Sequence, residues 1–251
     1  MIDRRNFLVA ATALITDALA PAQAAPLMPI RMGYFENYAP FSFRDTHGKM
    51  TGALVDAVEL VGHAAGLTFI HQGFPWVRAQ ALVQSGDLDG FCTTIDNQRR
   101  AYADFCPTPL ITEHFDICHR VNDRRMLNLH SVQDLRPFIQ GSYRGAGYPL
   151  QSLEADYIHW YKDVDTVMRL INSGGLDIYI GGNSVNALKL KELGLTRRIQ
   201  CTPAPYLPAA EFCFGLRRTY PNSAVVLAKI ETAAHAARQS GALDSMLVKY
   251  R

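Results

Sequence analysis

Apolar residues recur along the chain with two different periods, one typical of strands and the other of helices. Ile30, Met32 and Tyr34 occupy every second position, as in a half-buried strand. Between residues 54 and 65 the apolar positions recur every three or four residues, as on one helix face, and Gly66 follows as a stop. Strand and helix in alternation are typical of an α/β sheet with largely parallel strands. We therefore expect binding residues in loops at the carboxyl ends of the strands.

The same two periods predict the remaining strands and helices. Short apolar runs bounded by turn residues predict strands, and patterns of helical period predict helices, with Asp165 and Asn183 placed as N-caps. The strands are expected at 67–71, 88–92, 115–121, 137–142, 176–180 and 212–218, and the helices at 78–84, after Asp165, after Asn183, at 222–239 and up to Tyr250.

Two distant segments share one local design. Leu82-Val-Gln-Ser-Gly-Asp-Leu-Asp-Gly-Phe91 and Leu170-Ile-Asn-Ser-Gly-Gly-Leu-Asp-Ile-Tyr179 each contain a helix end, a Ser-Gly stop and a Leu-Asp that opens an apolar strand. The pattern favours two similar lobes. Because a helix, a glycine cap and a strand form a common unit, it does not require a shared ancestor.

The first 24 residues have the features of an export signal. Arg4 and Arg5 are followed by Phe7 and Leu8, an alanine-rich apolar run, and the cleavage pattern Ala22-Gln-Ala24. The paired arginines favour the twin-arginine export route, and an ordinary secretory signal is the alternative. No later stretch has the ~18 uninterrupted apolar residues of a spanning helix. We expect a soluble periplasmic protein.

Composition narrows the possible functions. With 251 residues and 48% hydrophobic content, the chain is long enough to bury a large core. The net charge of +2 comes without a basic block, so the sequence gives no sign of nucleic-acid binding. Neither C-x-x-C nor a zinc-ligand spacing of histidines occurs, and the nucleophile-elbow and phosphate-loop motifs are missing. We expect no metal, no cofactor and no catalytic residues.

Five cysteines would lie in an oxidising compartment if the chain is exported. Disulfides are then allowed, and the odd count leaves at least one thiol free. The spacing does not determine the pairing. The cysteines are at positions 92, 106, 118, 201 and 213.

Several short motifs, in this order, resemble the amino-acid-binding family of periplasmic solute-binding proteins, the receptors of ABC importers. None of them is specific alone, but together they cover nearly all of the chain after the signal. They are Tyr38-Ala-Pro-Phe-Ser-Phe43, Gly52-Ala-Leu-Val-Asp56, Pro75-Trp-Val-Arg78, Gly86-Asp-Leu-Asp89, Arg99 six residues before Phe105, Gly174-Gly-Leu-Asp177 and the terminal segment from Gly241 to Tyr250.

The resemblance implies a type 2 periplasmic-binding-protein fold, in which two α/β lobes close over a ligand in the cleft. The first lobe would comprise residues 25–112 and 212–251, and the second 113–211. The crossings would lie near 109–114 and 207–212. The implied function is a monomeric receptor that delivers a small carboxylate-bearing solute, such as an amino acid, to an ABC transporter permease.

Arg99 is the strongest candidate for binding the carboxylate. If Asp96 is the helix N-cap, Arg99 lies in the first turn, where the helix dipole disfavours a cation unless an anion is near. A guanidinium can grip a carboxylate through two parallel hydrogen bonds. The family places its carboxylate-binding arginine here, with Thr93 and Thr94 completing the pocket. Arg100 would point away into solvent.

The other candidate ligand contacts each have a structural alternative. Tyr38 follows the first strand, where the family places an aromatic ring over the ligand, and it could instead pack in the core. Trp76 is equally compatible with a cleft wall and with a buried anchor. Gly145, Ala146 and Gly147 follow a predicted strand, where backbone N–H groups can bind an anion.

The sequence departs from the family pattern at Gly182. Amino-acid receptors of the family usually have an aspartate at this position, which holds the α-ammonium group of the ligand. Asn183, the next residue, can accept a hydrogen bond but carries no charge, and a helix cap is the favoured interpretation. An anion is therefore predicted more firmly than an amino acid.

Two other functions use the same architecture. A periplasmic dehydratase of the cyclohexadienyl dehydratase type would need a general acid in the cleft, for which Glu36 and Glu113 are the nearest acids. A sensor or accessory module that presents a ligand to a membrane kinase would have the same sequence features.

Overall fold

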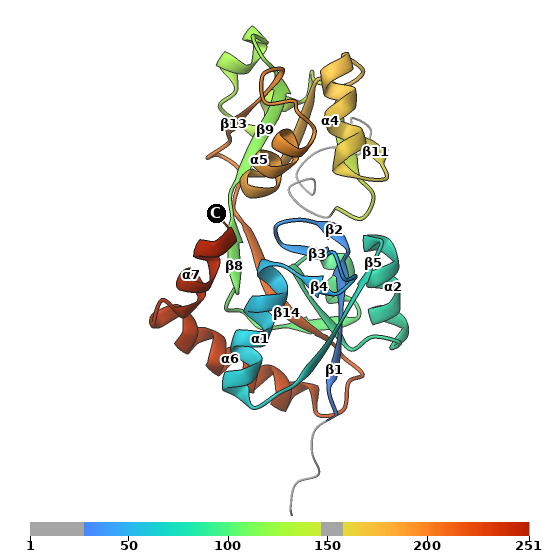
Figure 1. Ribbon diagram of the computed structural model, residues 1–251, viewed down its shortest axis with the longest axis vertical. Coiled ribbons are helices and arrows are strands. Elements are labelled where there is room, and N and C mark those ends of the chain that lie inside the picture. The colour runs from blue at the N-terminus through green and yellow to red at the C-terminus, as the bar shows by residue number, and fades with distance from the viewer. Residues whose placement is uncertain (1–27, 147–157, 251) are drawn as a thin grey trace, which may run out of the picture.

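The computed structural model describes residues 28–146 and 158–250, so the predicted signal and Gly147 lie outside the described residues. The chain forms two lobes, each built on its own sheet and flanked by helices (Figure 1). The prediction of an α/β fold with two sheets is confirmed. Within the described ranges, no helix has the length and apolar character needed to span a membrane.

The first lobe contains a six-stranded mixed sheet. Three of its strands are parallel, as predicted, but the strand formed near the end of the chain runs antiparallel to its neighbours because it returns from the other lobe. The order is β5 (Phe69–Phe74), β1 (Ile30–Phe35), β6 (Gly90–Thr94), β14 (Ala210–Arg217) and β7 (Ala103–Phe105), with β8 (Ile111–Glu113) also paired to β14.

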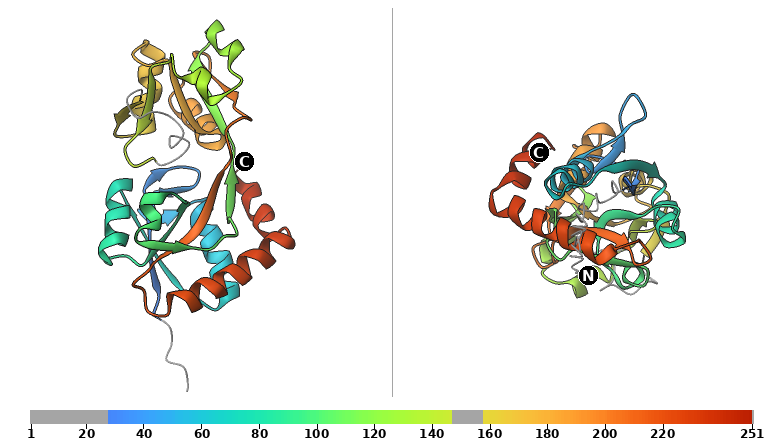
Figure 2. Two further views of the ribbon diagram at one scale, coloured as in Figure 1. Left: turned by 180° about the vertical axis from the view of Figure 1, so that it is seen from behind. Right: turned by 90° about the horizontal axis from the view of Figure 1, so that it is seen from below.

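Helices cover both faces of this sheet. The helices α1, α6 and α7 contact one another on one side, and α2 lies on the other side (Figures 1 and 2). Gly66 ends α1 in the left-handed conformation, with φ 68°. The elements are α1 (Ala53–Ala65), α2 (Trp76–Ser85), α3 (Asn97–Arg100), α6 (Ser223–Gln239), α7 (Ala242–Leu247), η5 (Val248–Tyr250) and the small sheet β2 (Asn37–Tyr38), β3 (Ser42–Arg44) and β4 (Met50–Thr51).

The second lobe contains a five-stranded mixed sheet. Its central strands pack against α4 and α5, and a separate apolar core lies between them. The order is β11 (Ile158–Tyr161), β10 (Gln140–Tyr143), β12 (Ile178–Gly182), β9 (Phe115–Arg120) and β13 (Ile199–Pro203), with α4 (Val164–Ser173), α5 (Asn183–Glu192), η1 (Arg124–Asn128) and η2 (Val132–Leu135).

The chain crosses between the lobes twice. The first crossing joins β8 to β9 and the second joins β13 to β14. Because β8 and β14 pair with each other, the two crossings lie side by side (Figure 2). The lobe boundaries expected at 112/113 and 211/212 fall inside these two paired strands.

The two similar sequence segments form the same structure in the two lobes. Gly86 ends α2 with φ 90° and Gly174 ends α4 with φ 85°, both left-handed. Asp89 accepts a hydrogen bond from the backbone N–H of Arg31 at 3.0 Å, and Asp177 accepts one from Ile139 at 3.0 Å. In both lobes the aspartate therefore fixes the start of one strand against its parallel neighbour.

Two predicted helix caps are wrong. The side chain of Asp163 caps α4, accepting from the N–H of Thr166 at 2.9 Å, whereas Asp165 lies in the first turn and pairs with Lys189. Gly182 occupies the N-cap position of α5, and no side chain caps that helix. In both cases the helix starts one or two residues away from the predicted cap, since periodicity does not locate a helix end sharply.

Cys118 and Cys201 form a disulfide between the adjacent strands β9 and β13. They lie directly opposite each other in the sheet register. Cys92, Cys106 and Cys213 are free and buried, all in the first lobe. The sequence permitted a disulfide, and strand pairing determines which cysteines meet.

The disulfide closes a long loop, since its cysteines are 83 residues apart in sequence. Cys118→Ala/Cys201→Ala is expected to lower the free energy of unfolding by about 2–4 kcal/mol, because the unfolded chain regains loop entropy. Urea denaturation measures this change. A reductant should lower the stability of the wild type and leave the variant unchanged. Equal stability of the oxidised wild type and the variant would contradict the prediction.

Candidate functional site

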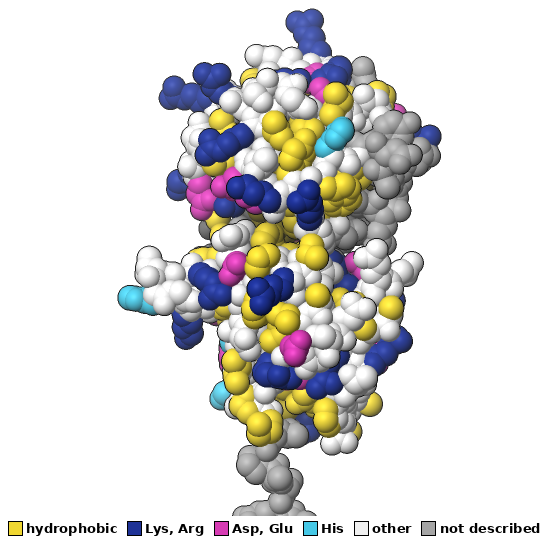
Figure 3. Space-filling model, turned by 90° about the vertical axis from the view of Figure 1, so that its right-hand side faces the viewer, with side chains coloured by type: hydrophobic (Ala, Val, Ile, Leu, Met, Phe, Trp, Pro, Cys, Tyr) yellow, Lys and Arg dark blue, Asp and Glu magenta, His cyan; other side chains and the backbone are white. Residues whose placement is uncertain are grey.

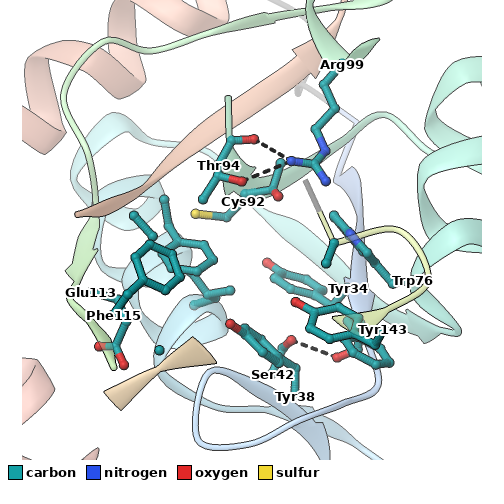
Figure 4. A pocket seen from close by; sticks show the side chains of 17 residues that line it. Tyr34, Tyr38, Ser42, Trp76, Cys92, Thr94, Arg99, Glu113, Phe115 and Tyr143 are labelled. Carbon is teal, nitrogen blue, oxygen red and sulfur yellow. Dashed lines mark hydrogen bonds between the residues drawn. The ribbon is translucent and has the colours of Figure 1, made fainter. Parts of the chain in front are cut away.

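A small cavity of about 50 Å³ lies between the two lobes (Figure 4). Because a water molecule needs roughly 10–15 Å³ by this measure, the cavity has room for about three to five water-sized groups. From the side, the lobes meet at a narrow waist (Figure 3). The predicted site residues that line the cavity are Tyr38, Trp76, Thr93, Thr94, Arg99, Ala146 and Gly182.

Arg99 lies in α3 at one side of this cavity and is only 2% exposed. Its Nε donates to Gln80 Oε1 at 3.0 Å, and Nη1 donates to the carbonyl of Thr94 at 2.9 Å and to its Oγ1 at 3.0 Å. The centre of the Trp76 ring lies 5.3 Å from the guanidinium carbon. The side chain is therefore held in one orientation by three neighbours.

Asp96 caps α3, as predicted, and also pairs with Arg99. Its Oδ1 accepts from the N–H of Arg99 at 2.7 Å, and its Oδ2 lies 2.9 Å from Nη1. Arg99 therefore already has an anion beside it at the start of its own helix, so the expectation of a cation without a partner is wrong. Burial lowers the pKa of Arg99, and the Asp96 carboxylate opposes that shift.

The carbonyl of Gly145 reaches Arg99 from the second lobe. Arg99 Nη2 donates to this oxygen at 3.2 Å, and Trp76 Nε1 donates to it at 2.9 Å. Gly145 has φ 87°, and a Cβ there would lie 2.9 Å from Trp76 Cδ1. Two donors of the first lobe thus converge on one acceptor oxygen, and the close approach requires glycine.

The loop around Gly145 differs from the predicted N–H cradle. The N–H of Arg144 donates to the carbonyl of Tyr161 at 2.9 Å, and the N–H of Ala146 donates to that of Tyr143 at 3.1 Å. Gly147 lies outside the described residues. In the described part of the loop, the group directed at Arg99 is an acceptor. The Arg100 side chain is exposed, as predicted, and so is that of Arg144.

Aromatic rings from both lobes form the apolar wall. Tyr143 of the second lobe lies with its ring centre 5.6 Å from that of Phe35 and 6.1 Å from that of Tyr38. Tyr38 also packs at 5.4 Å against Phe41 of the core. Trp76 lines the cavity and belongs to an apolar cluster under α2. Tyr38 and Trp76 therefore line the cavity and also pack against buried apolar residues.

Glu113 is a buried acid of the cavity wall, at the end of β8 where the chain leaves the first lobe. Its Oε1 accepts from the N–H of Ser184 at 2.7 Å, and its Oε2 accepts from Ser184 Oγ at 3.1 Å. Burial raises its pKa to about 7, and Asp116 adds to that effect. A carboxyl group with this pKa changes charge near neutral pH.

Gly182 leaves room for the Glu113 side chain. A Cβ at Gly182 would lie 2.8 Å from both Cγ and Oε1 of Glu113. Asn183 does not line the cavity: its N–H donates to the carbonyl of His114 at 3.0 Å, and it borders a separate surface pocket. The resemblance implies an acid at position 182. The carboxyl group of Glu113, from β8, occupies the space beside Gly182 instead.

Sequence reasoning missed several residues of the cavity. The sequence did not single out Tyr143, and it suggested Glu113 only as a possible general acid. Both line the cavity because the two lobes contact each other there, and no pattern of neighbouring residues predicts that contact. The described residues contain no cluster of three or more His, Cys, Asp or Glu side chains suited to a metal.

The sequence matches a known protein family. Residues 30–251 match the model described as bacterial extracellular solute-binding proteins, family 3. A search of curated proteins gave no significant match.

Solved structures share the fold. A histidine kinase sensor domain with similarity to periplasmic binding proteins has a TM-score of 0.76 at 20% identity, covering 90% of this chain and 96% of that chain. The arginine-, lysine-, histidine-binding protein ArtJ from Geobacillus stearothermophilus has a TM-score of 0.70 at 21% identity, covering 89% and 95%. An ancestral amino-acid-binding protein, a precursor of cyclohexadienyl dehydratase, has a TM-score of 0.70 at 19% identity, covering 88% and 94%. The predicted two-lobe type 2 fold is confirmed.

Glu113 is expected to make the stability of the protein depend on pH. Its pKa is about 7 in the folded chain and 4.5 as the ordinary value, so the folded state holds the proton more tightly. The free energy of unfolding should therefore fall as pH rises from about 4.5 to about 7, by an amount on the order of 3 kcal/mol. Thermal denaturation of the wild type and Glu113→Gln across this range measures the difference.

The variant should gain stability relative to the wild type with rising pH, since glutamine does not titrate. Glu211→Gln, which removes an exposed carboxylate from the neighbouring strand β14, serves as the matched control and should keep the wild-type profile. A constant stability difference between Glu113→Gln and the wild type would contradict the prediction.

Proposed function

Because the chain belongs to family 3 of the bacterial extracellular solute-binding proteins, we propose that it is a receptor for a small carboxylate-bearing solute held between its lobes. The observation that carries this proposal is the convergence of Arg99 Nη2 and Trp76 Nε1 on one acceptor oxygen. These two donors belong to the first lobe, and the oxygen comes from the second.

Opening of the lobes would remove the Gly145 carbonyl and leave both donors facing the cleft. A ligand carboxylate then takes the place of the carbonyl, and each charge-assisted hydrogen bond contributes about 1.5–3 kcal/mol. Asp96, Thr94 and Gln80 hold the guanidinium in position meanwhile, because their contacts come from the first lobe alone.

The aromatic wall would bind the rest of the solute. Tyr38 and Phe35 belong to the first lobe and Tyr143 to the second, so an apolar body between them touches both lobes. Only the closed form makes all of these contacts, and the ligand therefore shifts the equilibrium toward closure. A membrane permease can recognise the closed shape.

The proposed function requires export of the receptor to the periplasm. Arg4 and Arg5 with the following apolar run support export by the twin-arginine system. The receptor would then deliver its solute, an amino acid or a similar compound, to the permease of an ABC importer.

A sensory role is the second candidate, because the histidine kinase sensor domain is similar over 96% of its own length. The two roles use the same binding site and differ in the membrane partner. Adjacent genes for a permease and an ATPase would support import, and an adjacent gene for a membrane kinase would support sensing.

Arg99→Lys tests the binding site. The lysine keeps a positive charge beside Asp96 but loses the planar fork, so carboxylate affinity should fall by about ten- to a hundredfold. A thermal-shift screen of amino acids and other carboxylates finds the ligands, since a ligand at 100 times its Kd stabilises by about 2.7 kcal/mol. Titration calorimetry then measures the loss.

Arg100→Lys is the matched control, because Arg100 is the exposed neighbour of Arg99 on the same helix. It should bind as the wild type does. Circular dichroism checks that both variants fold. If Arg99→Lys binds carboxylates as tightly as the wild type, Arg99 is not the binding group.

A further inference from the structure

The end of the second lobe that faces away from the first lobe carries exposed cations. The strand β9 leads from the crossing to this end, where η1 follows it (Figure 1). Arg124 lies in η1, and Arg197 and Arg198 immediately precede β13. All three residues are exposed. Lys and Arg side chains project from this end of the molecule, at the top of the space-filling view (Figure 3).

Backbone contacts and ion pairs join three segments at this end. The N–H of Val121 donates to the carbonyl of Arg198 at 2.9 Å, which places the turn after β9 beside the start of β13. Asp177 links η1 to the start of β10: Arg125 Nη2 donates to its Oδ1 at 2.8 Å, and the N–H of Ile139 donates to its Oδ2 at 3.0 Å. The three segments therefore form one surface. We call this surface the basic end; it consists of Val121, Arg124, Arg125, Leu127, Ile139, Arg197 and Arg198.

The acids near the basic end already have a partner. Asp123 and Asp177 both pair with Arg125, at 2.6 Å and 2.8 Å. Among the residues that the structure describes, the other three arginines of the basic end form no ion pair with an Asp or Glu side chain. In the described part of the second lobe Lys and Arg outnumber Asp and Glu, whereas the two types are nearly balanced in the first lobe. The three arginines are therefore available to an external anion.

Exposed apolar side chains lie in the same surface. Leu127 is 76% exposed, Ile139 49% and Val121 37%. Single exposed apolar residues are ordinary on protein surfaces, but here three of them lie beside exposed arginines. Such a combination matches the boundary of a bilayer, where cations contact the headgroups and apolar side chains reach the acyl chains.

The size of the basic end favours a lipid surface over a protein partner. A stable protein interface uses about 20–30 residues a side and requires a complementary shape. The basic end offers far fewer residues. A bilayer needs no complementary shape, because its headgroups and acyl chains rearrange around the side chains that contact them. Arginine also suits phosphate, since its planar fork can donate two parallel hydrogen bonds.

We propose that the basic end is a docking surface for a membrane that contains anionic phospholipid. Its guanidinium groups bind lipid phosphates, and Leu127 inserts among the headgroups. The cavity between the lobes lies at the other end of the second lobe, so docking leaves that cavity free. This inference goes beyond the proposed receptor function and does not depend on it.

Sedimentation with vesicles tests the docking surface. Residues 25–251 are used, because the apolar run of the predicted signal binds lipid itself and all described helices and strands follow it. Vesicles of phosphatidylglycerol and phosphatidylcholine in equal parts should bind the protein at least about tenfold more tightly than vesicles of phosphatidylcholine alone. Raising the salt concentration from about 0.1 M to about 1 M should abolish this difference, because the Debye length falls from about 10 Å to about 3 Å.

The unpaired arginines should supply most of the affinity. Arg124→Gln/Arg197→Gln/Arg198→Gln is expected to lower the affinity for the anionic vesicles by about a hundredfold, since each arginine near an anionic surface contributes about fivefold. Circular dichroism and thermal denaturation check the fold, which should be unchanged because all three residues are exposed.

A matched control removes the same charge from the first lobe. Lys49→Gln/Arg78→Gln/Lys229→Gln changes three exposed cations and should bind the anionic vesicles as the wild type does. If this control loses as much affinity as the variant of the basic end, net charge explains the binding and the proposal is wrong.

Leu127→Ser tests the insertion. The variant should bind the anionic vesicles about tenfold more weakly, because a leucine side chain that enters the bilayer boundary is removed from water. Val225→Ser is the control: it changes a side chain that is 58% exposed on α6 and should keep the wild-type affinity.

The remaining outcomes separate lipid from other partners. If the wild type binds anionic and neutral vesicles equally, or binds neither, this inference is overturned and the receptor function is unaffected. If polyglutamate binds as tightly as the anionic vesicles and Leu127→Ser keeps the wild-type affinity for vesicles, the basic end recognises an acidic protein instead, which also overturns it. The vesicle comparison uses the wild type alone, so it decides the question even if a variant fails to fold.

Discussion

A guanidinium group that is only 2% exposed needs partners for its N–H groups, and this requirement organises the centre of the protein. The partners of Arg99 come from separate segments: Gln80 on α2, Thr94 at the end of β6, Asp96 at the start of α3, and Gly145 in the other lobe. One side chain thus ties three elements of the first lobe together and reaches across the cleft.

The same requirement determines which hydrogen-bond donors the first lobe presents to the cleft. The partners within the first lobe do not depend on closure, so only the contact with Gly145 is open to exchange. An oxygen from the second lobe and an oxygen from a solute are equivalent to the two donors, Arg99 and Trp76. If a solute binds there as proposed, its oxygen takes the place of the Gly145 carbonyl beside Arg99 and Trp76.

The sequence predicted the long periodic elements and the equivalent units of the two lobes, because these depend on neighbouring residues. It placed the capping glycines at 86 and 174 correctly. It did not predict the edge strand β11, which is four residues long, or the start of α4 at Asp163. Short strands and helix ends carry little local signal, since tertiary contacts decide where they begin.

The sequence by itself predicted an export signal, and it determined the alternation of strands and helices, the family resemblance and the position of Arg99 after a capping aspartate. The resemblance follows from the order of short motifs, and the others follow from residues close together along the chain. Only the tertiary structure decided that Cys118 meets Cys201, that the Gly145 carbonyl meets Arg99, and that Glu113 fills the space beside Gly182. These pairs are far apart in sequence, and they meet because strand pairing and the contact between the lobes bring them together.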